Sequence, residues 1–405
     1  LLLSSAASDV YKRQTFMWPK SFWYKVYEPI IRKAAGFGAA SIKHDKERYE
    51  HKYEYCDLLI TGSGPSGLAS AYTAAKNGAK VILAEDKPRF GGSLLTSEVT
   101  IGNQSGQEWA EKIISELKSM PNVIVKNRSQ VFGYYDHNML VMSERISDHL
   151  PKTEKYSPKQ RLWYIRAKEV VISSGSIERP LVFGNNDAPG VMLSSAAKEY
   201  LKVYGVLVGK KPIIFTNNDS GYETAIEFKK NGIDPVVLDT RISPDSEIIN
   251  EAKNLNIIIK NSYVVVAAKG YKKVKSADIA KISDDKKKLS TIENIECDCI
   301  CVSGFWTPSI HLASQSGNKT KFNEQIDSFI PNKSKQKETT LGSANGIFTL
   351  GETLKTSFEK GNELSKQLTN NDNKISIPAV VEKKSSEHDK FWCVPLPKGK
   401  NYKRF

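Results

Sequence analysis

The sequence predicts an α/β fold with two Rossmann-like domains, the second inserted into the first. Three features of the chain support this prediction. A glycine-rich turn at residues 62–67 joins a short apolar strand to an Ala-rich helix. A second strand, turn and helix of the same kind begins at residue 212. A further apolar strand at residues 346–350 returns to the first unit, so the second unit lies between two halves of one domain.

The composition is that of a globular protein long enough for more than one domain. The chain has 405 residues, of which 40% are hydrophobic and 26% are charged, which suffices for two or three buried cores. No run of about 18 apolar residues occurs, so we expect no membrane-spanning segment. The net charge of +14 raises the question of nucleic-acid binding. Because the lysines are spread along the chain, a solvated basic surface is the better interpretation, and we expect neither nucleic acid nor membrane as a partner.

The elements of the first unit follow from hydrophobic periodicity. Residues 57–61 are apolar and predict a buried strand, and residues 68–77 predict a helix. Residues 80–84 predict a second strand, which ends at Glu85. Helical spacing returns at residues 108–118. Short strands with a polar interruption are then predicted within residues 123–165, followed by a buried parallel strand at residues 169–173.

The second unit repeats the alternation of strands and helices. The predicted elements are, in order, a helix at residues 195–205, a strand at 212–216, a helix at 222–231 and strands at 236–238, 257–259, 264–267 and 299–303. The polar stretch at residues 314–345 predicts loops. Residues 346–350 predict the last strand, and residues 361–369 predict a closing helix.

The turn of the first unit carries the strongest functional signal in the chain. It consists of Gly62, Ser63, Gly64, Pro65, Ser66 and Gly67. Its first glycine permits a tight turn, its second lets a pyrophosphate approach the backbone, and its third allows the helix to pack close to the strand. The free N–H groups at the start of the helix favour phosphate. Glu85, at the end of the next strand, is placed to hold ribose hydroxyls and disfavours a 2′-phosphate, so the turn predicts a site for NAD or FAD rather than NADP.

Two later loops belong to the same predicted site. Ser174-Gly175 follows the strand at residues 169–173, and Gly351-Glu352 follows the strand at residues 346–350. Open α/β sheets bind ligands at the carboxyl ends of their strands. Either loop alone is compatible with an ordinary turn, but both in this order favour a binding role.

The corresponding turn of the second unit departs from the pattern. Residues 216–221 are Thr-Asn-Asn-Asp-Ser-Gly, so side chains replace the first two glycines and would crowd a pyrophosphate. Asp219 would also repel it. An enzyme that passes hydride from NAD(P)H to its own flavin needs two dinucleotide sites, whereas this chain is predicted to have one.

We assign no catalytic residue and no metal ligand. The histidines are scattered, and only His311 lies beside a predicted functional loop, where a structural role is the better interpretation. Cys297, Cys299 and Cys301 alternate, which on a strand would place them on one face as buried residues. No C-x-x-C motif occurs, which argues against a dithiol–disulfide reductase. Five cysteines without a disulfide framework fit a reducing cytoplasm.

The motifs divide the chain into domains and flanking segments. The dinucleotide-binding domain is predicted to comprise residues 55–192 and 305–370, and the second Rossmann-like domain residues 193–304. Residues 15–54 are interpreted as a connector, for which packing on the main body is favoured over a membrane-surface helix. Residues 1–14 resemble no secretory signal and are interpreted as a non-native leader. Residues 371–405 are predicted to be a linker toward a missing C-terminal domain.

Several segments together resemble the alpha subunit of heterotetrameric sarcosine oxidase. They are the glycine turn at residues 62–67, the segment 85–95, Ser-Gly-Ser-Ile-Glu-Arg-Pro at 174–180, Phe-Thr-Asn-Asn-Asp at 215–219 and Val-Ser-Gly-Phe-Trp-Thr-Pro at 302–308. Trp23-Tyr24, residues 27–29 and Ala35-Gly36 are similar to the segment that precedes this core. The resemblance covers roughly residues 17–405.

This resemblance implies a glutathione-reductase-like, FAD/NAD(P)-binding core of the pyridine nucleotide-disulfide oxidoreductase type, in which the first site holds NAD. In that family the FAD that oxidises sarcosine is on the beta subunit, FMN lies at the alpha–beta boundary, and gamma and delta subunits complete the complex. A C-terminal domain of alpha binds tetrahydrofolate, and the products are glycine, hydrogen peroxide and methylenetetrahydrofolate. By resemblance, the NAD site also includes Glu85, Asp86, Gly91, Gly92 and Ser93.

The sequence also departs from the family pattern. Most of the small ferredoxin-like domain that opens the family's alpha subunit is missing, as is everything after Phe405. Glu352 stands where related flavoproteins often have Asp, and Phe305 replaces a small residue. The resemblance therefore implies a piece that binds a dinucleotide and docks partners but does not turn over sarcosine alone.

Three other interpretations stay open at this point. The chain is alternatively a self-sufficient FAD-dependent NAD(P)H oxidoreductase, against which the altered second turn and the lack of C-x-x-C count. It is alternatively the alpha subunit of a related opine or proline dehydrogenase. In the third interpretation it is a non-catalytic scaffold, in which the nucleotide only stabilises a docking surface.

Overall fold

The computed structural model describes residues 19, 21–36, 42–152, 154, 156–371, 373–397 and 402–404. They belong to two compact parts, residues 1–47 and residues 48–405, and the second part contains both Rossmann units. The N-terminal part contains a π-helical turn, η1 (Trp23–Tyr27), and α2 (Glu28–Ala34), neither of which buries a residue. The leader predicted at residues 1–14 lies outside the described residues, and packing of the connector on the main body stays a prediction.

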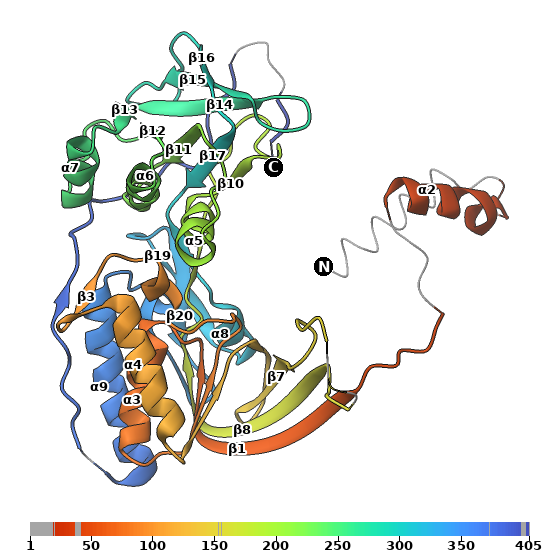
Figure 1. Cartoon of the computed structure of the whole chain (residues 1–405), viewed down its shortest axis with the longest axis vertical. Helices are drawn as coiled ribbons and strands as arrows, with labels where there is room; N and C mark the ends of the chain where they lie inside the picture. The colour runs from red at the N-terminus through yellow and green to blue at the C-terminus, as the bar shows by residue number, and fades with distance from the viewer. Residues whose placement is uncertain are drawn as a thin grey trace. The chain divides into compact units, whose positions relative to one another are not determined.

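The sheet of the first Rossmann unit, called the first sheet, has seven strands and combines a parallel part with an antiparallel part (Figure 1). The strand order is β5 (Val123–Lys126), β2 (Val81–Ala84), β1 (Tyr49–Thr61), β8 (Gln160–Ile172), β7 (Met139–Arg145) and β6 (Ser129–Tyr135), and β21 (Glu338–Thr340) pairs with the end of β8. The pairs among β5, β2, β1, β8 and β21 are parallel. The pairs of β7 with β8 and β6 are antiparallel.

Strands β1 and β8 are longer than the sequence predicted. Each has 13 residues, and they pair from Tyr49 opposite Gln160 to Thr61 opposite Ile172. The predicted strands at residues 57–61 and 169–173 correspond only to their buried carboxyl ends. The first half of β1 alternates Tyr with charged or polar residues and is half exposed, so its apolar content is too low for a pattern of continuous burial.

The carboxyl end of β1 is covered on both faces. Leu58 and Ile60 pack in one apolar cluster with α3 (Pro65–Lys76), α4 (Gly106–Ser119) and α9 (Leu350–Thr369). Leu59 points to the opposite face, where it packs with β7, β8 and α8 (His311–Gln315). Figure 1 shows α3, α4 and α9 side by side along the first sheet. The strand predicted at residues 57–61 is thus confirmed, as is the buried parallel strand predicted at residues 169–173, which pairs with it as the end of β8.

The returning part of the first domain differs from the prediction. The strand predicted at residues 346–350 is wrong, because the returning strand is β21 and α9 already begins at Leu350. The helix predicted at 361–369 is only its last half. The spacing of Leu350, Leu354 and Phe358, all buried, is helical. The loop predicted at residues 314–345 contains β19 (Lys319–Asn323), β20 (Ser328–Lys333), β21 and the 3₁₀ turn η3 (Gly342–Asn345).

The second sheet is parallel throughout, and its strands lie in sequence between β8 and β21. Its order is β10 (Val191–Leu193), β17 (Cys299–Ser303), β11 (Pro212–Thr216), β12 (Val236–Asp239) and β13 (Ile258–Asn261). One face carries α5 (Ser194–Tyr204), α6 (Ser220–Lys230) and α7 (Glu247–Asn254). The other carries the antiparallel strands β14 (Tyr263–Lys269), β15 (Ser276–Lys281) and β16 (Glu293–Glu296). The predicted insertion of one Rossmann unit in the other is confirmed, while the exact domain boundaries stay predictions.

The two Rossmann units are joined by paired crossovers. The chain enters the second unit through β9 (Ser176–Glu178) and leaves it through β18 (Trp306–Pro308), and these two strands pair antiparallel. Because both connections pair in one small sheet, this sheet is the junction of the two Rossmann units.

The three alternating cysteines do not share one face, contrary to the prediction. Cys299 and Cys301 lie on β17 and face α5 and α6. Cys297 precedes the strand and packs in the opposite cluster. All three are buried and free, as expected for apolar core residues. Among the described residues no group of three or more side chains suited to a metal ion occurs.

The C-terminal segment packs on both Rossmann units, so the linker predicted at residues 371–405 makes fixed contacts in its middle part, while its role as a linker stays a prediction. Strand β22 (Val380–Val381) pairs with β3 (Thr100–Ile101), which in turn pairs with β4 (Gln104–Ser105). Phe391 and Val394 are buried in the core of the second unit. Residues 382–394 are called the strap below. Within the described part of the chain, no helix is both long and apolar enough to span a membrane.

Candidate dinucleotide-binding site

The glycines of the first turn are held by different constraints. Gly62 has φ +96°, and a Cβ atom there would lie 2.3 Å from the Ser173 carbonyl oxygen. A Cβ atom on Gly67 would lie 2.0 Å from the carbonyl oxygen of Gly62. These two glycines are therefore required by the fold itself.

Gly64 is the exception. Its φ of −67° and ψ of −177° are open to any residue, and a Cβ atom there would meet nothing within 4 Å. No packing constraint of the chain requires glycine at this position. A bare backbone facing open space at the start of α3 is the arrangement that a pyrophosphate needs, so the turn fits a dinucleotide.

The start of α3 has the donors for that anion. Gly64 is the N-cap residue and provides no side-chain cap, and Pro65 follows at the first helical position, where a missing N–H costs nothing. No acidic residue lies in the first turn. The N–H groups of Ser66 and Gly67 have no intrahelical acceptor, and the helix dipole is positive there. This helix start therefore favours phosphate.

Glu85 lies at the end of β2 and is almost fully buried, with 6% exposure. Its Oε2 accepts hydrogen bonds from Ser63 N (2.8 Å) and Ser63 Oγ (2.5 Å), and its Oε1 accepts one from Lys87 N (3.0 Å). Burial raises the pKa of Glu85 to about 7, and a hydrogen bond with Asp86 adds to this effect. Asp86 itself is exposed. Because a carboxylate oxygen can accept two hydrogen bonds, Oε1 retains capacity for a ribose hydroxyl.

The loop at residues 91–93 lies against the glycine turn. Gly91 N donates to the Ser63 carbonyl oxygen (3.1 Å) and to Ser63 Oγ (3.3 Å). A Cβ atom on Gly92 would lie 2.8 Å from Gly64 Cα, so only glycine allows this approach. Gly92 begins the 3₁₀ turn η2 (Gly92–Leu95), in which Ser93 is exposed. The structure thus brings these three predicted residues to the start of α3.

Ser174-Gly175 also lies beside the turn. Ser173, the last residue before this loop, donates through Oγ to the carbonyl oxygens of Thr61 (2.8 Å) and Gly62 (3.0 Å). Ser174 Oγ donates to the Ser309 carbonyl oxygen (2.8 Å). The loop after β8 is therefore adjacent to the loop after β1, although the Ser174 hydroxyl already has a partner.

Gly351-Glu352 lies in the first turn of α9 rather than in the predicted loop after a strand. The N–H groups of Leu350 and Gly351 donate to the two carboxylate oxygens of Glu382 (2.6 and 2.8 Å). Glu352 is exposed. The helix start is thus capped by a carboxylate of the strap, and no local pattern in the sequence indicates this cap.

Gly342 connects the starts of α3 and α9 and was missed by sequence reasoning. It has φ +65°, and a Cβ atom there would lie 2.9 Å from Ser66 Oγ and 3.4 Å from Thr353 Cγ2. Only a glycine fits between the two helices. The first turn of α9 is therefore a near neighbour of the predicted phosphate position.

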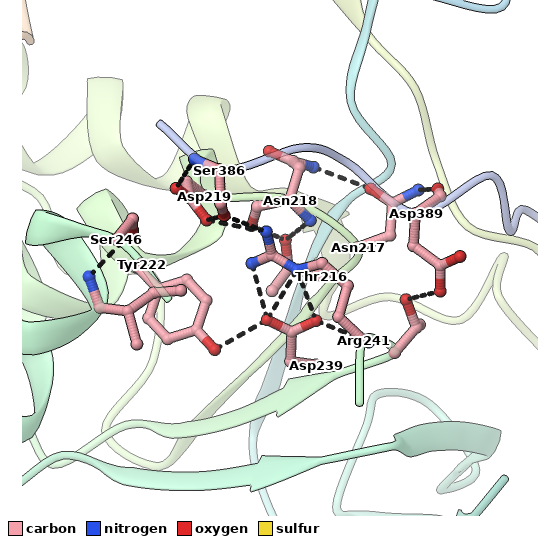
Figure 2. A network of polar contacts seen from close by, with 12 residues as sticks. Thr216, Asn217, Asn218, Asp219, Tyr222, Asp239, Arg241, Ser246, Ser386 and Asp389 are labelled. Atoms are coloured by element: carbon pink, nitrogen blue, oxygen red, sulfur yellow. Dashed lines mark hydrogen bonds and ion pairs between the residues drawn. The ribbon is translucent and has the colours of Figure 1, made fainter. Parts of the chain in front are cut away.

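The second turn, after β11, is filled by the chain itself. Figure 2 shows Arg241 between Asp239 and Asp219, with Ser386 of the strap beside Asp219. Asp219 Oδ1 lies 2.9 Å from Arg241 Nη1, and Asp219 Oδ2 accepts a hydrogen bond from Ser386 N (2.7 Å). The sequence predicted that this turn is unsuited to a pyrophosphate. It did not predict that Arg241 and the strap would contact Asp219.

The fold and the first site together define the class of protein. Residues 56–366 match the family model described as pyridine nucleotide-disulphide oxidoreductase, so the chain belongs to that family. Its fold implies FAD/NAD(P) binding. The thioredoxin reductase of T. acidophilum has the same fold: the TM-score is 0.58 at 15% sequence identity, over 77% of this chain and 98% of the other.

The predicted resemblance to sarcosine oxidase alpha subunits is confirmed. The chain is 38% identical over 345 residues to the subunit alpha of Rhizobium meliloti (strain 1021), which covers 85% of this chain and 34% of the relative. It is 30% identical over 369 residues to that of Corynebacterium sp. (strain P-1), covering 90% of this chain and 38% of the relative. The chain thus spans about a third of the length of these relatives.

Proposed function

We propose that the chain binds a single dinucleotide, with NAD as first choice and FAD as the alternative, at the start of α3. The observation that carries the proposal is the open position over Gly64, which no packing constraint of the fold explains. Gly62 to Gly67 would hold the pyrophosphate through backbone N–H groups, and Glu85 would accept a hydrogen bond from a ribose hydroxyl. Gly91 to Ser93 would close the site from the side.

The choice of NAD over FAD and NADP rests on charge and on the resemblance. The Glu85 carboxylate disfavours the 2′-phosphate of NADP. The start of α9 lies next to the start of α3, and its Leu350 and Gly351 N–H groups already donate to the Glu382 carboxylate. These N–H groups are therefore not free to bind FAD, which is longer than NAD. A flavin dinucleotide carries one more negative charge than oxidised NAD, which a fixed carboxylate disfavours.

We further propose that the chain is the core of an alpha subunit in a sarcosine oxidase-type complex. Such a complex demethylates sarcosine oxidatively to glycine, with tetrahydrofolate as the one-carbon acceptor. A beta-type subunit that carries FAD, with gamma and delta subunits, would be its partners, and FMN would lie at the subunit interface. The support is the identity of 30–38% with relatives that carry this name. We expect a cytoplasmic complex, and an isolated chain that docks partners without oxidising sarcosine.

The first test is the nucleotide content of the purified chain. Denaturation is expected to release about one NAD per chain, and the native protein is expected to show no flavin absorption. Strong flavin bands would support FAD and a self-sufficient oxidoreductase instead. A chain that neither contains nor binds a dinucleotide would overturn the proposal and favour the scaffold interpretation.

The second test is reconstitution. Co-expression with a beta-type amine oxidase subunit is expected to yield a stable complex that forms hydrogen peroxide with sarcosine. The same assay with proline and with an opine identifies the substrate class. Oxidation of proline or of the opine without oxidation of sarcosine would contradict the assignment to sarcosine. It would leave the proposed dinucleotide site unaffected.

A further inference from the structure

The strap makes contacts that dinucleotide binding at the first turn does not require. It leaves the first unit at Glu382, crosses to the second unit, and ends with Val394 in that unit's core. Lys383 pairs with Glu251 of α7 on the way. The strap contacts the two positions that matter for nucleotide binding in a Rossmann fold.

These two positions follow from the topology. In the first unit they are the turn after β1 and the acidic residue at the end of the adjacent strand β2. In the second unit the equivalents are the turn after β11 and Asp239 at the end of β12, because β11 and β12 pair in parallel from Ile213 opposite Val236 to Thr216 opposite Asp239. A dinucleotide in the second unit would need both positions at once.

Asp239, the acidic residue at the end of β12, is paired with Arg241. Arg241 donates from Nε to Asp239 Oδ1 (3.0 Å) and from Nη2 to Asp239 Oδ2 (2.8 Å), which is a bidentate pair. Tyr222 donates its hydroxyl to Asp239 Oδ2 (2.8 Å). The Asp239 side chain is 0% exposed and that of Arg241 is 9% exposed. Arg241 N also donates to Asp239 Oδ1 (2.9 Å), so each oxygen has at least two donors and Asp239 has no capacity left for a ribose.

The turn after β11 is occupied by residues of the strap. The Asp219 carboxylate accepts hydrogen bonds from Ser386 N (2.7 Å) and Ser386 Oγ (2.8 Å), and it pairs with Arg241 Nη1 (2.9 Å). Arg241 Nη1 also donates to Ser386 Oγ (2.7 Å) and to the carbonyl oxygen of Glu387 (3.1 Å). In Figure 2 the strap passes directly over Asp219. A carboxylate of the chain thus lies at the start of α6, where a phosphate would lie in a nucleotide-binding unit.

The strap then pairs with the backbone of the same turn. Asn217 and Asp389 exchange hydrogen bonds, since Asp389 N donates to the Asn217 carbonyl oxygen (2.8 Å) and Asn217 Nδ2 donates to that of Asp389 (2.9 Å). Thr240 Oγ1 donates to Asp389 Oδ2 (2.8 Å), and Lys286 Nζ lies 3.0 Å from the same oxygen. Every charged group of this contact therefore has a partner inside the chain.

The strap also contacts the junction of the two Rossmann units, the small sheet of β9 and β18. The His388 ring stacks on Phe305, with centroids 3.9 Å apart and planes 3° apart. Phe305 immediately precedes β18 and has φ +69°, a strained conformation for a residue with a side chain. Arg179, just after β9, lies over the rings of Phe305 (5.8 Å) and Trp392 (5.0 Å). Both crossovers are thus held by residues of the strap.

We propose that the strap is an internal ligand of the second Rossmann unit: it occupies the place of a second dinucleotide, with Asp219 and Arg241 as the residues that exclude nucleotides from this unit. A nucleotide could enter only after the Ser386–Asp219 contacts and the His388 stack are broken. The entering pyrophosphate would then meet two carboxylates and one guanidinium, a net negative charge in a buried place, which disfavours it. The second unit therefore serves to hold the two units in one orientation.

Hydrogen exchange of the full chain, measured with and without millimolar NAD, NADH and NADPH, tests the proposal. Peptides over residues 216–221 and 386–394 are expected to exchange slowly, with rates that change less than twofold when nucleotide is added. Faster exchange of the strap on addition of nucleotide, or new protection at 216–221, would overturn the proposal. The peptide over 62–67 reports on the first site separately, because lack of protection there contradicts only the proposed function.

Two variants test the role of Asp219. In Asp219→Ala the strap is expected to exchange at least tenfold faster, with rates in the first unit unchanged. The matched control is Asp298→Ala, since Asp298 accepts backbone hydrogen bonds from Lys210 and Lys211 (both 2.8 Å) in the same unit. Ser386→Ala leaves the Asp219–Arg241 pair intact and provides the same readout if Asp219→Ala does not fold. Strap exchange as slow in both variants as in the wild type would show that these contacts do not hold it.

Discussion

At the scale of single residues, the glycines of the first turn separate structural from ligand-binding roles. The motif alone predicts that Gly62, Gly64 and Gly67 all matter. The geometry assigns two of them to the fold, because a Cβ atom would clash with backbone oxygen atoms, and leaves Gly64 without a structural reason. This distinction provides variants with opposite expected effects.

Gly67→Ala is expected to destabilise the protein by about 2–3 kcal/mol, because its Cβ atom would lie 2.0 Å from the Gly62 carbonyl oxygen and the turn would have to open. Urea unfolding measures the loss, and Ser66→Ala in the same helical turn is the control. An unchanged midpoint for Gly67→Ala would show that α3 is not packed against the turn as described.

Glu85 predicts that dinucleotide affinity depends on pH. Burial raises its pKa to about 7, and its Oε1 accepts a hydrogen bond from a ribose hydroxyl most strongly when the carboxyl group is ionised. Between pH 6 and 8 the ionised fraction rises from about 10% to about 90%, so affinity for NAD is expected to rise by up to about tenfold. Titrations at several pH values measure this, and Glu85→Gln is expected to remove the dependence. A flat profile in the wild type would contradict a role for this carboxylate.

The same pKa has the opposite consequence for stability. Because the folded-state pKa of Glu85 lies above the ordinary value of 4.5, its protonated form is favoured in the folded protein. This contribution to the free energy of unfolding is fully present below about pH 4.5 and is lost as the pH rises through about 7. Binding of a dinucleotide therefore compensates a carboxylate that is unfavourable in the free protein near neutral pH.

The sequence was sufficient for those site residues that belong to a local motif and insufficient for those that do not. Gly62 to Gly67 and Glu85 lie at spacings fixed by one strand, one turn and one helix, so their positions could be predicted. Gly342 and Glu382 reach the site only through packing of α9 on α3 and through the path of the strap. No local pattern encodes a contact between residues so far apart in the chain.

At the scale of secondary structure, α9 shows how a short apolar run misleads. Residues 347–350 are Ile-Phe-Thr-Leu, which favours a strand by composition. Continuing the pattern to Leu354 and Phe358 gives helical spacing, and both side chains are buried against the first sheet and α3. The strand that completes the sheet is instead the three-residue β21, which is too short to show a period.

The start of α9 is expected to depend on Glu382. Glu382→Ala removes the carboxylate that accepts from Leu350 N and Gly351 N, and a loss of about 1 kcal/mol of stability is expected from the missing cap and its favourable interaction with the helix dipole. Thermal unfolding measures the change. The control is Glu352→Ala, an exposed acidic residue of the same turn, for which a smaller loss is expected. Equal losses would mean that the cap contributes nothing beyond its charge.

At the scale of the whole molecule, the sequence predicted the two Rossmann units and their insertion but not how they are held together. The insertion follows from order along the chain, because a second strand–turn–helix pattern interrupts the first. The orientation depends on contacts such as Asn217 with Asp389 and Phe305 with His388. Residues 371–389 are rich in Asn, Lys and Ser and contain one short apolar run, Ile-Pro-Ala-Val-Val at 377–381, so a linker was the natural prediction for a segment that in fact packs on both units.

On the two proposals above, the first Rossmann unit has an open dinucleotide site and the second has a filled one. The first turn ends in a bare backbone beside Glu85, while the second carries Asp219 paired with Arg241 and covered by Ser386. Two units of the same fold would then have different tasks: the first would bind the ligand and the second would fix the arrangement of the two units.

Titration of NAD into the wild-type chain and into Gly64→Ala, with thermal unfolding of both proteins, tests the central claim most directly. The added methyl group meets no atom of the chain within 4 Å but occupies the position assigned to the pyrophosphate. We predict equal unfolding temperatures without ligand, binding of one NAD by the wild type, and an affinity at least tenfold weaker in the variant. Equal affinity of the two proteins for NAD would contradict the account.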